Sequence, residues 1–309
     1  MYKEKRRLKN KESNFVSAVV YIHNDEKNIG KFIKGLLGVL NENFKEFEIV
    51  CVDDNSTDKS VNTIKDILKK EKVDNTVNLI SLSFFHGVEL AMNAGIDMSI
   101  GDFVYEFDCI NMDFEWNMIM QVYRKELEGF DITSAAPDLK GRWSSKLFYW
   151  LLKHENENVA NMRTESFRLV SRRAINRVNA MNIDIPFRQI AYVSSGLNIT
   201  SISFVPHNTN YNLNIFYRKN LAVNVILIFT SICDKIIVAL SVFAAILGLI
   251  QMIKRKAGGE NKILLSGVFL MLGVIIKYLK VINNFIFKKQ HYIVGGVKIK
   301  ITFTAKFFL

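Results

Sequence analysis

Short apolar runs rich in β-branched residues alternate with amphipathic segments along the first half of the chain. The runs that predict strands lie at residues 15–21, 47–53, 78–83, 102–107 and 131–135. Between them, apolar residues recur at helical spacing over residues 26–40, 57–70, 87–99 and 113–127. This alternation predicts an α/β domain, Rossmann-like, with a mostly parallel sheet. We expect its ligand crevice at the carboxyl ends of the strands.

The pattern is weaker between residues 140 and 217, where helices are expected at 144–153 and 171–181 and a strand near 200–205. Beyond residue 217 the chain becomes strongly apolar. Residues 236–253 carry no charge, a length that suits a slightly short membrane span. A second apolar run starts at Ile263, and we predict a two-helix transmembrane hairpin over residues 236–287.

Two shorter segments flank the hairpin. Residues 218–235 mix apolar residues with Asn224, Thr230 and Ser231, which favours an interfacial amphipathic helix over a third span. Residues 288–309 are expected to form a cytoplasmic tail. At the other end of the chain, residues 1–14 form a basic tail with no signal-peptide core behind it, so the domain over residues 15–217 is expected in the cytoplasm.

The formal net charge of +11 is concentrated near the apolar runs. Seven basic residues flank the two spans and four lie between them, a bias that favours cytoplasmic ends. A re-entrant hairpin that does not cross fully is the alternative. Because these charges suit acidic headgroups and no nucleic-acid recognition motif is present, we expect a cell-membrane protein that binds no nucleic acid. Such hairpins can associate, so a homo-oligomer is also an open alternative.

The three cysteines, Cys51, Cys109 and Cys233, have the spacing of neither a disulfide framework nor a zinc site. A reducing compartment suits them.

Carboxylates follow three of the predicted strands. Asp53 and Asp54 end the strand over residues 47–53, Asp25 follows the first strand, and Asp108 and Asp113 follow the strand over residues 102–107. Each group could cap the helix that follows it. Three such groups at strand ends also suit contacts with a nucleotide and with a cation that neutralises phosphate charge.

These segments resemble glycosyltransferase family 2, of the GT-A fold, and in particular the polyprenyl-phosphate glycosyltransferases and dolichol-phosphate mannose synthase. VVYIHNDEKNI is similar to the family's VVPVYNEEENI, and CVDDNSTDKS to its VDDGSTDGT. HGVELAMNAGIDMSIGDFVYEFD resembles the stretch that leads into the family's aspartate motif. SSKLFYWLL, SFRLVSRRAINRV and YLKVINNFIFKKQHYIV resemble later segments, so the resemblance covers nearly the whole chain.

The resemblance implies roles for individual residues. The donor nucleotide is expected to contact Tyr21, His23, Asp25, Asp53 and Asp54. Tyr21 and His23 stand where the family usually has proline and tyrosine. The resemblance further implies phosphate or acceptor contacts in GRWSSK and SFRLV, and Arg188 in PFRQI is a weaker candidate of the same kind. The candidates in those two segments are Arg142, Ser145, Lys146 and Arg168.

The aspartate motif departs from the family pattern. Asp108 matches the first aspartate of the family's DxD, but Ile110 stands at the second, and Met112 replaces a glutamine that helps hold the metal in some members. Neither side chain offers an oxygen ligand to Mg²⁺ or Mn²⁺. Three alternatives follow: Asp108 holds a cation with the donor's diphosphate and water, Asn111 or Asp113 substitutes through a shifted loop, or basic residues balance the phosphates without metal.

The resemblance implies an inverting transfer of a sugar from a nucleoside diphosphate to a polyprenyl phosphate or related lipid carrier at the cytoplasmic membrane face. Such an acceptor is already anionic and needs no general base. One alternative is a transferase that extends a surface polysaccharide, with Asp113 as the base for a sugar hydroxyl. Another is a silent membrane protein that binds sugar nucleotides without turnover.

Overall fold

The computed structural model describes residues 11–71, 77–138, 165–181, 188–207 and 294–298, together with some helical positions between 267 and 282. Contacts divide the chain into two units. One comprises residues 1–140, 161–211 and 290–309, and the other comprises residues 141–160 and 212–289. Every described strand belongs to the first unit, where all the strands join one sheet.

The centre of the sheet is parallel. It consists of β1 (Val16–Ile22), β2 (Phe47–Asp53), β3 (Val77–Leu82) and β4 (Phe103–Phe107). β1 pairs with β2 on one side and with β4 on the other, and β3 extends the sheet beyond β2. Each of these strands is rich in buried β-branched or aromatic residues, as expected for strands covered on both faces.

Four further strands complete an eight-stranded sheet in the order β7-β5-β6-β4-β1-β2-β3-β8. On one side, β6 (Phe167–Ser171) runs antiparallel to β4 and to β5 (Ile132–Pro137), and β5 is parallel to β7 (Ile199–Phe204). At the opposite edge, β8 (Val294–Lys298) pairs antiparallel with β3. The chain therefore leaves this sheet after β7 and returns to it at β8.

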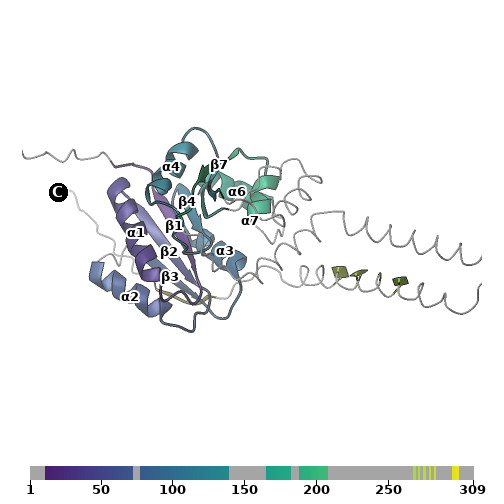
Figure 1. Cartoon of the computed structure of the whole chain (residues 1–309), viewed down its shortest axis with the longest axis horizontal. Coiled ribbons are helices and arrows are strands. Elements are labelled where there is room, and N and C mark those ends of the chain that lie inside the picture. Colours follow the sequence, from purple (N-terminus) through teal and green to yellow (C-terminus); the bar gives the residue numbers. More distant parts are fainter. Residues whose placement is uncertain are drawn as a thin grey trace, which may run out of the picture. The chain divides into compact units, whose positions relative to one another are not determined.

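Helices cover both faces of the sheet. Along β1, Val20 and Ile22 share a buried apolar cluster with residues of α1, α2 and α4, whereas Val19 and Tyr21 share another with residues of α3 and α6. Figure 1 shows α1 crossing in front of the strands. The bounds are α1 (Ile29–Asn43), α2 (Ser60–Glu71), α3 (Val88–Met98), α4 (Asn117–Glu126), α6 (Arg172–Ala180) and α7 (Arg188–Ser194).

Close packing of α3 on the sheet requires glycine at position 95. A Cβ atom built on Gly95 would lie 2.3 Å from a methyl group of Val19 and 2.7 Å from one of Val52. Both distances are shorter than real Cβ contacts allow, so any larger residue would push α3 away from β1 and β2.

The five strands predicted in the first half of the chain are confirmed, as are the helix near residues 171–181, the strand near 200–205 and the mostly parallel sheet. α1 and α4 begin three and four residues later than predicted, at Ile29 and Asn117, because the residues before them form turns and loops. β6, α7 and β8 were not predicted, and β8 lies within the expected tail over residues 288–309.

Several predictions fall on residues that the structure does not describe. They are the helix at 144–153, the interfacial helix at 218–235 and the greater part of the hairpin over 236–287, and most of the basic tail over residues 1–14 lies there too. Among the residues that are described, no helix combines the length and apolar character needed to span a bilayer.

Candidate functional site

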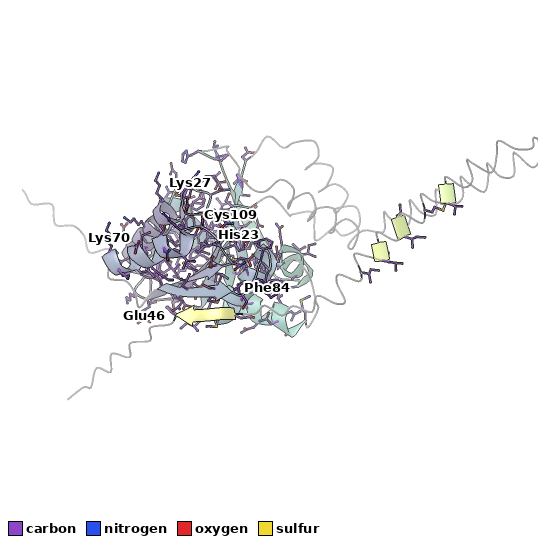
Figure 2. The ribbon with its side chains drawn as sticks, turned by 90° about the horizontal axis from the view of Figure 1, so that it is seen from below. His23, Lys27, Glu46, Lys70, Phe84 and Cys109 are labelled. Carbon is purple, nitrogen blue, oxygen red and sulfur yellow. The ribbon has the colours of Figure 1, made fainter. Side chains whose placement is uncertain are left out.

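The three acidic strand ends meet at one edge of the sheet. β1 is parallel to β2 and β4 and lies between them, with Ile22 opposite Asp53 and Val20 opposite Phe107. The residues that follow these strands therefore leave the sheet at the same edge. His23, after β1, and Cys109, after β4, are both found there (Figure 2). The parallel pairing of β1 with β2 and β4 thus places the ends of the three strands at one edge of the sheet.

The loops after β1 and β2 are locked together. Asn24 and Asn55 both adopt the left-handed conformation, with φ of 56°. The side-chain oxygen of Asn24 accepts hydrogen bonds from the backbone N–H of Thr57 at 2.9 Å and from its hydroxyl at 3.2 Å. Glu26 adds two more bonds between the loops, since its N–H donates to Asp58 Oδ2 and its Oε2 accepts the N–H of Lys59. These bonds give the edge a fixed shape before any ligand binds.

Asp54 has an internal role in place of the predicted donor contact. Its side chain is fully buried, and its two oxygens accept hydrogen bonds from the N–H groups of His86 at 2.7 Å and Gly87 at 2.8 Å. The hydroxyl of Tyr21 also donates to it at 3.1 Å. A carboxylate with these partners cannot also face a nucleotide, because its acceptor sites are directed at the β3–α3 loop and β1. Asp54 therefore holds the ends of three strands together.

The other predicted donor residues lie in or just after β1 and β2, and two of them, Tyr21 and Asp53, are buried. His23 is half-buried, and its Nδ1 lies 2.8 Å from the backbone oxygen of Asp54. Asp25 Oδ2 accepts the N–H of His23, and Asp53 Oδ1 accepts the N–H of Ser56. Burial raises the pKa of Asp25 and of Asp53 above the ordinary value for aspartate. Of these three groups, the imidazole of His23 and the carboxyl group of Asp25 are partly exposed, whereas Asp53 is 4 % exposed.

Asp108 is held by two arginines from distant parts of the chain. Arg168 on β6 donates from Nη2 to Asp108 Oδ2 at 2.7 Å. Arg188, the first residue of α7, donates from Nη2 to Asp108 Oδ1. The two guanidiniums are almost completely buried, whereas a third of the Asp108 side chain, 33 %, is exposed. Asp108 is therefore more exposed than the two arginines that hold it.

Three more carboxyl groups surround the same guanidiniums. Glu106, fully buried on β4, lies 3.4 Å from Arg168 Nη1 and 3.3 Å from Arg188 Nε, and it accepts the hydroxyl of Tyr192. Glu165 is 2.9 Å from Arg168 Nε, and Glu89 is 3.7 Å from Arg188 Nε. The cluster thus connects β4 and β6, through Glu106 and Arg168, to α3 and α7, through Glu89 and Arg188. Within the described residues, the four carboxyl groups of the cluster thus outnumber its two guanidiniums.

The cluster shifts the pKa of its members in opposite directions. Burial opposes the ionisation of Asp108, but the charges of Arg188 and Arg168 outweigh it and lower the pKa of that carboxyl. Burial dominates for Glu89 and Glu165 and raises the pKa of both. Asp108 therefore holds its negative charge more readily than Glu89 or Glu165 does. Burial also raises the pKa of the neighbouring Cys109 to about 12, so that thiol is no nucleophile at neutral pH.

The rest of the aspartate motif faces the interior. Ile110 is 4 % exposed and packs in the apolar core, and Met112 packs against the same core. Asp113 is also buried, and its Oδ2 accepts the hydroxyl of Ser166 at 2.7 Å. The described residues contain no group of three histidine, cysteine or acidic side chains arranged to hold a metal. Asp108 is the partly exposed carboxylate of the motif, but both of its oxygens already accept hydrogen bonds from arginines, so the described residues do not form a cation site by themselves.

The predicted phosphate-binding residues divide into two groups. Arg168 joins Asp108 in the cluster, while Arg142, Ser145 and Lys146 lie outside the described residues. The sequence analysis named Arg188 only as a weaker candidate. It missed the four residues that complete the cluster, because no local pattern links residues so far apart. They are Glu89, Glu106, Glu165 and Tyr192.

Comparison with known proteins decides the family. Residues 17–178, more than half of the chain, match the model of glycosyl transferase family 2. The chain belongs to glycosyltransferase family 2. The matched range runs from β1 into α6, so it includes the acidic ends of β1, β2 and β4. Arg168 lies within the matched range, and Arg188 lies outside it. The family that the sequence motifs resembled is therefore confirmed.

Curated relatives share the family over part of their length. The chain is 28 % identical over 172 residues to an uncharacterised glycosyltransferase of Synechocystis, covering 54 % of this chain and 53 % of that one. It is 29 % identical over 138 residues to the undecaprenyl-phosphate 4-deoxy-4-formamido-L-arabinose transferase of Pseudomonas fluorescens, covering 43 % and 40 %. The chain thus spans about half or less of the length of these relatives.

Solved structures support the GT-A fold. The mannosyltransferase PcManGT of Pyrobaculum calidifontis, in complex with GDP-Man and Mn²⁺, aligns with a TM-score of 0.54 at 12 % identity, over 90 % of this chain and 88 % of that one. Mannosyl-3-phosphoglycerate synthase of Rubrobacter xylanophilus aligns with a TM-score of 0.50 at 17 % identity, over 68 % and 71 %. At these identities the likeness shows the fold, which agrees with the predicted Rossmann-like domain.

Proposed function

We propose that this family 2 member is an inverting glycosyltransferase. It moves a sugar from a nucleoside diphosphate to a polyprenyl phosphate, or a related lipid carrier, at the cytoplasmic face of the cell membrane. The observation that carries the proposal is the meeting of three acidic strand ends at one edge, with Asp108 as a partly exposed carboxylate. The lipid acceptor is supported by relatives named undecaprenyl-phosphate sugar transferases.

The nucleotide of the donor binds at the corner formed by the β1 and β2 ends. Asp53 and Asp25 have carboxyl groups there, and His23 lies against both strand ends. These groups suit hydrogen bonds to the base and the ribose, because a strand-end carboxylate in this type of sheet faces the crevice. Tyr21 contributes indirectly, through its bond to Asp54. The locked loops keep this corner preorganised, which lowers the entropic cost of binding.

Asp108 lies beside the position of the donor's diphosphate in this proposal. The described residues do not fit a divalent cation there by themselves, so we assign no step of the transfer to Mg²⁺ or Mn²⁺. Structures of the same fold contain Mn²⁺ together with a nucleotide sugar. The thioether of Met112 and the aliphatic Ile110 contribute no ligand.

The reaction is a direct displacement at the anomeric carbon of the sugar. An oxygen of the acceptor phosphate attacks that carbon, the new carbon–oxygen bond forms, and the bond to the diphosphate breaks with its electron pair on the leaving group. A phosphate monoester has a second pKa of about 6, so the nucleophile is already anionic at neutral pH. The protein therefore contributes positioning and charge stabilisation, and Asp113, buried and bonded to Ser166, is not required as a base.

The anchoring of the site at a membrane is supported by the apolar sequence over residues 236–253, and the sheet topology limits how often the chain could cross. The chain leaves the sheet after β7 and returns to it at β8, where Leu82 on β3 is paired with Val294. A segment that starts and ends at one folded sheet can cross a bilayer only an even number of times. This argument favours the two-span hairpin and disfavours a third span at Leu221–Cys233.

The proposal is tested with the purified full chain, a panel of radiolabelled sugar nucleotides, undecaprenyl phosphate and Mn²⁺. We expect release of nucleoside diphosphate and formation of a labelled lipid whose sugar is removed by mild acid, as a glycosyl phosphate is. Label in an acid-stable glycan would instead favour extension of a surface polysaccharide. Calorimetric binding of a sugar nucleotide without any release would favour a silent binder and contradict the proposal.

A further inference from the structure

Two neighbouring phenylalanines are exposed on the loop that follows β3. Phe84 is 50 % exposed and Phe85 is 52 % exposed, whereas the other phenylalanines that the structure describes are buried or partly buried. Single apolar residues scattered over a surface are ordinary, but two adjacent aromatic rings in water indicate a partner that covers them.

The loop holds the two rings in place. The backbone N–H of His86 donates to the buried carboxylate of Asp54 at 2.7 Å. The ring of Phe84 stacks on the ring of His86, with their centroids 4.0 Å apart. The ring of Phe85 lies 4.8 Å from that of His23. Because these contacts would break if the rings turned inward, the exposure of the pair is a fixed feature of the fold.

The chain leaves the sheet and returns to it at the edge where this loop lies. Val294, the first residue of β8, pairs with Leu82, the last residue of β3, and Figure 2 shows Phe84 near the start of β8. β7 ends at the same edge, because it is parallel to β5, and β5 and β4 are both antiparallel to β6. After β7, the N–H of His207 donates to the backbone oxygen of Asp113 at 3.0 Å. Residues 208–293 therefore begin and end at the carboxyl edge of the sheet.

The path from the predicted hairpin back to this edge is short. The hairpin is predicted to end at residue 287, so residues 288–293 alone connect it to β8. The chain from residue 287 to Val294 spans at most about 25 Å even when fully extended. Phe84 comes two residues after the pairing partner of Val294. In the proposed membrane arrangement, the two exposed rings are therefore tethered close to the lipid surface.

We propose that the loop over residues 83–87 docks on the bilayer, with the rings of Phe84 and Phe85 in the interfacial layer. Phenylalanine on an otherwise polar surface suits the boundary between headgroups and acyl chains. Val205, 79 % exposed directly after β7, lies at the same edge. The inference rests on the proposed function for the membrane anchor. It goes beyond the anchor by giving the domain one orientation, with the carboxyl edge of the sheet toward the lipid phosphates.

The other occupant that suits aromatic rings is the base of the donor nucleotide, because bases stack on such side chains. Phe85 lies against His23, which belongs to the proposed donor corner. A base there would cover Phe85 but would leave the exposure of Phe84 and the short connection to β8 without a reason. The bilayer accounts for both rings and for the connection.

The test measures the depth of the loop in the full chain, reconstituted into vesicles of phosphatidylethanolamine and phosphatidylglycerol. Phe84→Trp and Ile100→Trp each add one fluorophore to the three native tryptophans, whose signal is subtracted using the wild type. Ile100 is the matched control, because it is 71 % exposed and precedes β4, at the opposite edge of the sheet. Lipids brominated near the headgroup should quench Phe84→Trp at least about twofold more strongly than Ile100→Trp.

Equal quenching of the two variants would overturn the inference, and so would quenching of neither. A chain that does not float with the vesicles would overturn it together with the proposed membrane anchor. If the chain floats and transfers sugar but Phe84→Trp is not quenched, the inference fails and the proposed function stands. Quenching of Phe84→Trp without any transfer would contradict the proposed function alone.

A double variant, Phe84→Ser with Phe85→Ser, separates the bilayer from the base as the occupant. We expect the KM for undecaprenyl phosphate in vesicles to rise roughly tenfold, the scale of losing the burial of about one such ring. The affinity for UDP or GDP, measured by calorimetry in detergent, should stay within about twofold of the wild type. A loss of nucleotide affinity with an unchanged KM for the lipid would identify the base as the occupant and overturn the inference. Ile100→Ser is the control and should change neither value.

Discussion

Arg168 Nη2 donates a hydrogen bond of 2.7 Å to Asp108 Oδ2 across 60 residues of sequence. The contact links β6, which was absent from the predicted elements, to the residue that follows β4. It brings an arginine from a motif expected to bind phosphate onto the aspartate expected to bind a metal. The residue expected to bind phosphate and the residue expected to bind a metal therefore lie in the same cluster at the sheet edge.

Asp54 and Tyr21 should affect stability to different degrees. Tyr21→Phe removes one of the hydrogen bonds to Asp54 and should lower the free energy of unfolding by about 1 kcal/mol. Asp54→Ala leaves the buried N–H groups of His86 and Gly87 without their acceptor and should lower it by about 3 kcal/mol. Chemical denaturation of the full chain in detergent measures both. Equal effects of the two variants would contradict the internal role of Asp54.

The carboxyl group of Glu126 should make the free energy of unfolding depend on pH. Burial raises the pKa of this carboxyl from 4.5 to about 8, so the folded protein binds its proton more tightly than the unfolded chain does. The stabilisation due to that proton is complete below about pH 4.5 and is lost as the pH rises through about 8. Glu126→Gln should unfold at nearly the wild-type midpoint at pH 5 and be more stable at pH 9 by on the order of 2–4 kcal/mol.

The control for this prediction is Glu128→Gln. Glu128 is on the same stretch of chain, pairs with Lys125 and is 58 % exposed. Its replacement should change the free energy of unfolding by less than about 0.5 kcal/mol at either pH. If the wild type and Glu126→Gln lose stability in parallel between pH 5 and pH 9, Glu126 does not carry the proton that the structure assigns to it.

The return of the chain at β8 predicts the topology of any membrane insertion. β3 and β8 pair in one sheet, so an epitope placed before residue 11 and one placed after Lys298 should lie on the same side of the membrane. An epitope inserted between residues 254 and 262 should lie on the opposite side if the hairpin crosses fully, and on the same side if it is re-entrant. Protease protection in sealed vesicles separates these arrangements. Opposite sides for the first two epitopes would rule out the paired β8.

The elements that the sequence predicted well are those with strong local patterns. β2, over Phe47–Asp53, is an apolar run that ends in two aspartates, and its predicted and observed bounds agree. α1 was predicted three residues too early, because Glu26 looks like the first turn of a helix but bonds to Asp58 in the neighbouring loop. Such cross-loop bonds depend on a residue about 30 positions away and leave no local signal.

The buried cluster could not be predicted for the same reason. β6 contains Arg168 in the middle of an apolar run, and a charged residue there argues against a buried strand unless partners neutralise it. Those partners are Glu106 on β4 and Asp108 just after it, brought close by the antiparallel pairing of β6 with β4. Strand-end carboxylates, by contrast, could be placed at one edge from the alternation of elements alone.

The most direct test of the central claim is nucleoside diphosphate release by Asp108→Asn in the full chain, assayed with undecaprenyl phosphate and the sugar nucleotide that the wild type uses. Asparagine keeps the size of the side chain but removes the charge that faces the donor. We expect a loss of at least roughly 100-fold in turnover, on the scale of removing one electrostatic contact to a reacting group, with the melting temperature showing that the variant is folded. Turnover close to that of the wild type would place the chemistry elsewhere and contradict the account.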